Sequence, residues 1–109
     1  MHAARSAARV LISTAPDQET ADRLAGMLVG SGLAACVNLL PGTGSVYVWE
    51  GQVQRDSEIL MVVKTTAGRA EEVIGLIELE HPYECPEAIV LDVAGGSHDY
   101  LEWIAATVG

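Results

Sequence analysis

Basic side chains are scarce in this chain. Its 109 residues include six Lys and Arg against fifteen Asp and Glu, so the formal net charge is −9 at pH 7. Proteins that bind nucleic acid neutralise phosphates with Lys and Arg, so this balance argues against a nucleic-acid partner. An acidic surface attracts cations, although most acidic proteins bind no metal ion specifically.

Cysteines and long apolar runs are also rare. Cys36 and Cys85 have no CxxC or zinc-like spacing, and two free thiols favour the reducing cytoplasm. The apolar run at residues 10–12 is too short for a signal-peptide core, and no segment is long enough to span a membrane. We therefore expect a cytoplasmic protein with a disordered N-terminal tail (residues 1–8) and a single domain (residues 9–109).

Hydrophobic periodicity predicts alternating strands and helices. Apolar runs favour strands at residues 9–14, 33–40, 45–49, 52–64 and 88–93. Apolar spacings of three and four predict helices that follow Asp17, Thr66 and Ser97, and Ser97 can cap the last one. The order βαββαβ plus a C-terminal helix indicates an α+β fold of the ferredoxin-like split βαβ type, with an antiparallel sheet and both crossover helices on one face.

The second and third strands predict a long hairpin with a tight turn at Glu50-Gly51. An arm of about 13 residues at about 3.3 Å each is about 40 Å long, whereas a domain of this size is about 34 Å across. The tip (residues 46–49, VYVW) should therefore project past its own core. Because an exposed apolar strand attracts another chain, we expect an oligomer. The alternative is a shorter hairpin folded back at Pro41-Gly42.

The loop from His81 to Glu87 (HPYECPE) contains more polar and reactive side chains than an ordinary connecting loop. It holds an imidazole, a phenol, a thiol and two carboxylates, and two prolines stiffen it. A rigid loop with polar groups suits a binding site because little entropy is lost on binding. His81 and Glu84 are candidate metal ligands, although the residues alone favour a structural histidine at a helix end for His81. Tyr83 and Glu87 are candidates for a ligand cleft, and interface packing is the alternative for Tyr83.

Two candidates lie outside this loop. Trp49 can line the same cleft from the hairpin, and interface packing explains it equally well. Lys64 is a lone cation at the end of an apolar strand. Lys64 can hold an anionic ligand or pair with a carboxylate of a neighbouring copy, such as Glu87, and we favour the pair. The sequence contains no activated nucleophile, cofactor loop or HExxH motif, so we expect no catalytic residue, no enzyme and no certain cofactor.

Six segments together resemble the CutA family of divalent-cation tolerance proteins. In the family's order they are TAPD (14–17), LAACVN (33–38), SVYVWEG (45–51), KT (64–65), HPYE with PE (81–87) and YLEW (100–103). The resemblance implies a ferredoxin-like subunit of a homotrimer similar to PII signalling proteins, and a role in tolerance of copper and other divalent ions. It also implies a second possibility, a sensor of a small organic ligand at the clefts between subunits.

This sequence departs from the copper-binding members of that family at two positions. Those members carry a cysteine where Ser13 stands and a His-His pair where Glu80-His81 stands. Losing a thiolate and an imidazole removes the softer ligands that favour copper. The remaining donors near His81 suit Zn²⁺ or Mn²⁺ at least as well as copper.

Overall fold

The computed structural model describes residues 6–109, which form a four-stranded sheet and three helices. The strands are β1 (Ala8–Ala15), β2 (Cys36–Trp49), β3 (Gln52–Thr66) and β4 (Ile89–Asp92), and the helices are α1 (Gln18–Gly30), α2 (Ala70–Glu80) and α3 (His98–Thr107). The strand order is β2-β3-β1-β4, and each neighbouring pair is antiparallel. The predicted ferredoxin-like α+β fold is confirmed, with the apolar strand β3 in the interior of the sheet as its sequence indicated.

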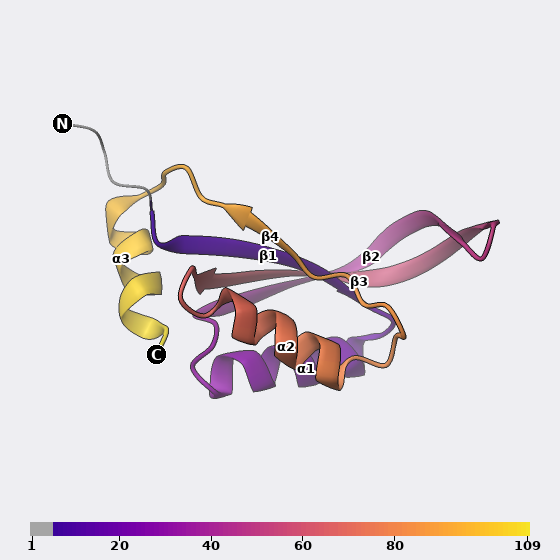
Figure 1. Cartoon of the computed structure of the whole chain (residues 1–109), viewed down its shortest axis with the longest axis horizontal. Coiled ribbons are helices and arrows are strands. Elements are labelled where there is room, and N and C mark those ends of the chain that lie inside the picture. The colour runs from indigo at the N-terminus through magenta and orange to yellow at the C-terminus, as the bar shows by residue number, and fades with distance from the viewer. Residues whose placement is uncertain (1–5) are drawn as a thin grey trace.

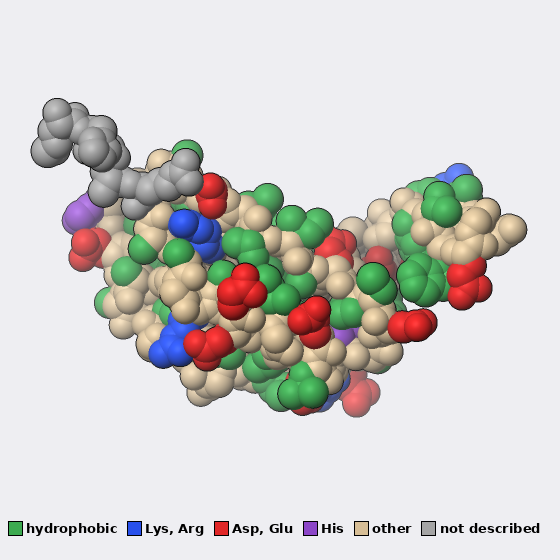
Figure 2. Space-filling view, in the orientation of Figure 1, with side chains coloured by type: hydrophobic (Ala, Val, Ile, Leu, Met, Phe, Trp, Pro, Cys, Tyr) green, Lys and Arg blue, Asp and Glu red, His purple; other side chains and the backbone are tan. Residues whose placement is uncertain are grey.

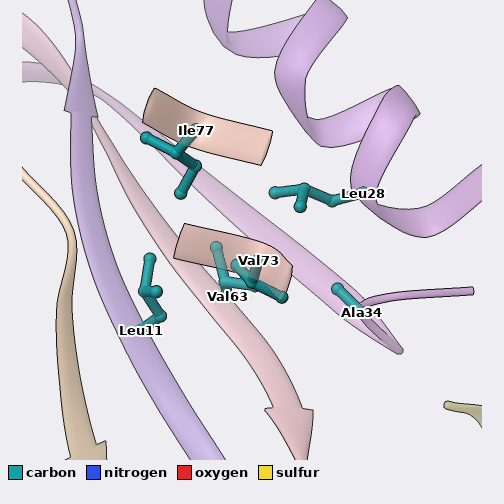
Figure 3. Close-up of a cluster of buried hydrophobic side chains, with 6 residues drawn as sticks. All are labelled: Leu11, Leu28, Ala34, Val63, Val73 and Ile77. Carbon is teal, nitrogen blue, oxygen red and sulfur yellow. The ribbon is translucent and has the colours of Figure 1, made fainter. Parts of the chain in front are cut away.

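Helices α1 and α2 cover one face of the sheet (Figure 1). Leu28 of α1 and Ile77 of α2 pack against Leu11 of β1 and Val63 of β3 (Figure 3). All four side chains are 0% exposed. Since successive strand residues point to opposite faces, the neighbours of Leu11 and Val63 face away from these helices.

The opposite face of the sheet carries a group of apolar side chains that are half-buried or exposed. It carries seven apolar side chains from all four strands, aligned by the strand register: Val10, Ile12, Leu40, Leu60, Val62, Ile89 and Leu91. We refer to these seven as the open face. Leu40, Ile89 and Leu91 are 45%, 54% and 47% exposed. Among the described residues, α3 covers this side only at the end near Ala8, where Ile104 packs. A water-facing surface of this kind usually marks an interaction site.

The β2–β3 hairpin extends beyond the body of the molecule (Figures 1 and 2). The molecule measures 50 × 29 × 22 Å along its principal axes. Glu50 and Gly51 form the predicted tight turn, with φ of 52° and 77°. The alternative of a shorter hairpin is wrong: β2 continues past Pro41-Gly42, where the register shifts between Leu40 and Thr43. Such an irregularity bends a strand without ending it.

Some element boundaries differ from the expected ones. β1 begins at Ala8, inside the segment expected to be a tail, and residues 1–5 of that segment lie outside the described residues. β2 begins at Cys36 rather than at residue 33, because the N–H groups of Leu33 and Ala34 both donate to the carbonyl of Leu28 and close the end of α1. The division into a tail and one domain stays a prediction.

The helix starts also differ in detail. Asp17 caps α1, because its carboxylate accepts the N–H of Thr20 at 2.8 Å. α2 begins at Ala70 because β3 continues to Thr66. Ser97 occupies the N-cap position of α3, but its side chain makes no capping hydrogen bond, so the predicted side-chain cap is wrong. Along residues 6–109, no helix has the length and apolar character needed to cross a bilayer.

Candidate functional site

A pocket of about 780 Å³ lies between the β2–β3 hairpin and the loop that follows α2. The hairpin contributes residues 44–47 and Trp49, and the loop contributes residues 82–85 and Glu87. Thr14 of β1 and Glu58 of β3 complete the lining. We refer to this space as the hairpin pocket. Figure 2 shows the hollow between the projecting hairpin and the body.

His81 fixes the start of the loop. α2 ends at Glu80, and Pro82 disfavours helical geometry at the residue before it. His81 is 7% exposed. Its Nε2 lies 2.7 Å from the carbonyl oxygen of Thr14, and its Nδ1 accepts the N–H of Tyr83 at 3.1 Å. Because a carbonyl can only accept, Nε2 carries the ring proton. His81 thus ties the loop to strand β1.

The same hydrogen bonds decide how His81 could meet a metal ion. A metal ligand needs a free nitrogen lone pair, but Tyr83 occupies that of Nδ1 and the proton occupies Nε2. Glu84 is exposed on the wall of the hairpin pocket. Within residues 6–109, no three His, Cys, Asp or Glu side chains come close enough together to hold one ion. The donors of a single chain in this conformation therefore do not fit a metal ion.

Ser13 and Glu80 are the two positions that depart from the copper-binding pattern. Their side chains lie outside the hairpin pocket. Ser13 is 0% exposed on the helix-covered side of β1, and its hydroxyl has no hydrogen-bond partner among the described residues. The Glu80 carboxylate lies 3.3 Å from the guanidinium of Arg23 and so joins α2 to α1.

Tyrosine hydroxyls hold two carboxylates on the hairpin side of the pocket. Tyr83 donates to Oε2 of Glu58 at 2.8 Å, and Glu58 is only 6% exposed. Burial, together with this hydrogen bond, raises the pKa of Tyr83, so its hydroxyl remains a donor. Tyr47 donates in the same way to Asp56, which raises the pKa of Tyr47. The Tyr83 ring also packs against His81, with ring centroids 4.6 Å apart.

Glu87 completes the charged wall. Burial raises the pKa of Glu87, and the negative charge of Glu58 raises it further. The lining contains three carboxylates, Glu58, Glu84 and Glu87, and among the described residues it contains no Lys, Arg or His. The pocket can therefore stabilise positive charge.

The structure brings most of the predicted site residues together. Trp49, Tyr83, Glu84 and Glu87 all line the hairpin pocket. His81 begins the same loop and accepts the N–H of Tyr83, but it does not line the pocket. Lys64 lies apart from them. It is on the same side of the sheet as the open face, where its ammonium donates to the side-chain oxygen of Asn38, and it lines a smaller pocket of about 190 Å³ beside α3.

Sequence reasoning missed Glu58. One sequence feature could have pointed to it: Glu58 directly precedes the apolar run of residues 59–63 on an interior strand. A charge at such a position needs a partner if it is buried, and the partner turned out to be Tyr83, 25 residues away.

Residues 9–107 match the CutA1 divalent ion tolerance protein family. The chain belongs to this family. The divalent-cation tolerance protein CutA of Pectobacterium atrosepticum is 44% identical over 99 residues, which cover 91% of this chain and 90% of the relative. The crystal structure of CutA from Xylella fastidiosa superposes with a TM-score of 0.92 at 38% identity, covering 95% of this chain and 100% of that one. The periplasmic divalent cation tolerance protein CutA from Archaeoglobus fulgidus gives 0.90 at 34% identity, covering 94% and 99%.

Membership in the CutA1 family confirms the resemblance carried by the six sequence segments. It also agrees with the expectation that the chain is not an enzyme, because the matched proteins are divalent-cation tolerance proteins. The CutA1 fold explains the layout of the site: the long hairpin and the loop after α2 form opposite walls of one pocket.

Proposed function

We propose that this CutA family member works as a homotrimeric divalent-cation tolerance protein and that the hairpin pocket is its recognition site. The observation that carries the proposal is the lining of the pocket. Three carboxylates face it, and Glu58 among them is almost fully buried. Low dielectric strengthens the attraction of such groups for a cation.

Three surfaces support the homotrimer. The open face leaves Ile89 and Leu91 about half exposed. Strand β2, 14 residues long, lies at the edge of the sheet with one side unpaired by any described strand. On the hairpin, Val46, Val48 and Val53 are 60%, 69% and 66% exposed. Apolar faces and long free edges of this kind attract further copies. The family resemblance favours three copies.

Lys64 has a role in the proposed trimer. It lies on the side of the sheet that we propose to be covered, so its ammonium can pair with a carboxylate of a neighbouring copy. Glu87 is one candidate acceptor, and the Lys64→Met binding measurement described below decides whether it is the partner. Light scattering after size exclusion tests the assembly. A mass of three chains at micromolar concentration is expected, and a stable monomer would remove this part of the proposal.

For the cation, we propose that His81 and Glu84 bind copper or another divalent ion at the pocket. His81 must first release Tyr83 or Thr14, and donors of a neighbouring copy complete the ligand set. Isothermal titration of Cu²⁺ and of Zn²⁺ tests this with His81→Ala and Glu84→Gln. Glu71→Gln, an exposed residue of α2 outside the pocket, is the matched control. Binding should weaken in the first two variants only, and no saturable binding to the wild type would remove the metal ion.

The second candidate is a PII-like sensor of a small organic ligand. It is favoured by the volume of the hairpin pocket, about 780 Å³, because small-molecule sites occupy about 300–1,000 Å³ and are rich in aromatic side chains. A thermal-shift screen of nucleotides and metabolites tests it. A hit that disappears in Trp49→Ala or Tyr83→Ala supports a sensor, and a broad panel without any hit argues against one.

We also propose that the protein resides in the cytoplasm. Cys36 and Cys85 are free thiols, which a reducing compartment preserves. The relative from Archaeoglobus fulgidus is a periplasmic protein, so the location must be measured. Cell fractionation with antibody detection would overturn this prediction if the protein appeared outside the cytoplasm.

A further inference from the structure

The hairpin pocket combines two features that select for different parts of one ligand. Its acidic part comes from Glu58 on β3 and from Glu84 and Glu87 on the loop. Its aromatic part comes from Tyr47 and Trp49 on the hairpin and from Tyr83 on the loop. Acidic and aromatic groups thus stand on both walls of a single space.

Aromatic faces attract cations that carry little bound water. The negative face of a Tyr or Trp ring stabilises an ammonium, amidinium or guanidinium group, most strongly where water is excluded. A strongly hydrated metal ion gains less from such a wall, because it keeps its water or takes oxygen and nitrogen ligands. Three aromatic residues are therefore better matched to an organic cation.

The size of the pocket points the same way. At about 780 Å³ it can hold a whole small molecule. A single ion would be contacted by few of the lining groups, because no three His, Cys, Asp or Glu side chains within residues 6–109 come close enough together to hold one. A ligand with a ring and a positively charged group can contact both walls at once.

We infer that the hairpin pocket binds an organic cation that carries an aromatic or other planar group. This inference rests on the proposed function, in which the pocket is the recognition site, and it names the ligand class. The charged group binds Glu58 and Glu87, and the planar group stacks between Trp49 and Tyr83. The hydroxyl of Tyr83 holds Glu58 in place, so one carboxylate oxygen is fixed before the ligand arrives.

The pKa of Glu87 agrees with this geometry. Burial raises the pKa of Glu87, and the negative charge of the nearby Glu58 carboxylate raises it further. A bound cation relieves this repulsion. Binding should therefore be accompanied by proton release from Glu87 in buffers near its pKa, which titration in buffers of different ionisation enthalpy detects.

The test uses the assembled full chain and three probes of one shape: benzamidine, which is cationic, benzamide, which is neutral, and benzoate, which is anionic. Guanidinium chloride at equal concentration supplies the charge without the ring. Ligand-observed NMR and isothermal titration measure the affinities. Benzamidine should bind saturably and at least about tenfold more tightly than each of the other three probes, because a charge-assisted hydrogen bond and ring stacking act together.

Variants locate the binding. Glu87→Gln should weaken benzamidine about tenfold, and Trp49→Leu should weaken it by several-fold. Glu58→Gln should act like Glu87→Gln. Because Glu58 is buried, its variant counts only if thermal unfolding shows a folded protein, and Glu87→Gln remains decisive otherwise. Glu71→Gln removes the same charge outside the pocket and should leave the affinity unchanged.

Equal affinities for benzamidine and benzamide, or equal effects of Glu87→Gln and Glu71→Gln, would overturn the inference. Lys64→Met tests whether the ammonium of a neighbouring copy occupies the pocket in place of a ligand. If an ammonium from a neighbouring copy already fills the pocket, Lys64→Met will tighten benzamidine binding about tenfold and overturn the inference. Light scattering and a copper-tolerance assay report on the proposed function separately. A trimer that supports tolerance but ignores benzamidine would refute the ligand class alone.

Discussion

Truncating Leu91 separates a functional open face from an ordinary exposed surface. Leu91 lies on β4 and is 47% exposed in the single chain. Complete burial of a leucine side chain contributes about 1.5–3 kcal/mol, so covering the exposed half of Leu91 contributes about 1 kcal/mol per copy. A trimer contains three such sites, and Leu91→Ala should therefore cost it about 3 kcal/mol. That cost lowers the association constant about 100-fold.

Leu79→Ala provides a matched control. Leu79 lies on α2, on the helix-covered side of the sheet, and is 80% exposed. The same atoms are removed, but no interface is expected there, so assembly should be unaffected. Both variants should keep the far-ultraviolet circular dichroism of the wild type, because neither residue belongs to the buried core.

The assay is a dilution series in moderate urea, followed by sedimentation velocity or light scattering. Leu91→Ala should dissociate at a protein concentration well above that of the wild type and of Leu79→Ala. Identical dissociation of the two leucine variants would refute the reasoning, because it would show that the open face is not the covered surface. A wild type that is monomeric at every concentration would refute it without any variant.

Three further perturbations have defined outcomes. Leu11→Ala should lower the free energy of unfolding by about 2–5 kcal/mol in urea titrations, because Leu11 is fully buried between the sheet and both helices. Tyr83→Phe should cost about 1.5–3 kcal/mol, because it leaves buried Glu58 without its hydroxyl donor, whereas Tyr100→Phe on exposed α3 should cost little. The pKa of Glu87 is raised by folding, so its contribution to stability is fully present below the unfolded pKa and is lost as pH rises through the folded one. Glu87→Gln should therefore be more stable than the wild type at neutral pH, with the difference vanishing below about pH 4.

Much of the fold could be predicted because local signals and tertiary packing agree. Asp17 caps α1 through Thr20, as its position before an apolar stripe indicated. The turn at Glu50-Gly51 has the positive φ values that a tight hairpin requires. The overlong hairpin followed from strand geometry alone. The end of α1 was less predictable. Residues 33–34 have the composition of a strand, but their N–H groups donate to the carbonyl of Leu28.

Most residues of the site could be predicted from the sequence, but their hydrogen-bond partners could not. Tyr83, Glu84 and Glu87 are neighbours in sequence, and a loop of such composition indicates a site. The contact between His81 and Thr14 spans 67 residues, and the one between Tyr83 and Glu58 spans 25. Such contacts depend on the order of strands in the sheet, which places β1 beside β3. A sequence read locally cannot show which carbonyl or carboxylate will satisfy a histidine or a tyrosine.

Assembly and recognition are coupled through the hairpin. Beyond the register shift at Thr43, the hairpin strands pair only with each other among the described elements, and an isolated two-stranded ribbon is marginally stable in water. The same ribbon carries Tyr47 and Trp49, which form one wall of the hairpin pocket. A neighbouring copy that covers Val46, Val48 and Val53 would therefore also fix that wall. Less ordering would remain to be done when a ligand binds, so the assembled protein would bind it more tightly than a single chain. On this argument a change at the open face that weakens assembly, such as Leu91→Ala, lowers the affinity of a pocket that it does not touch.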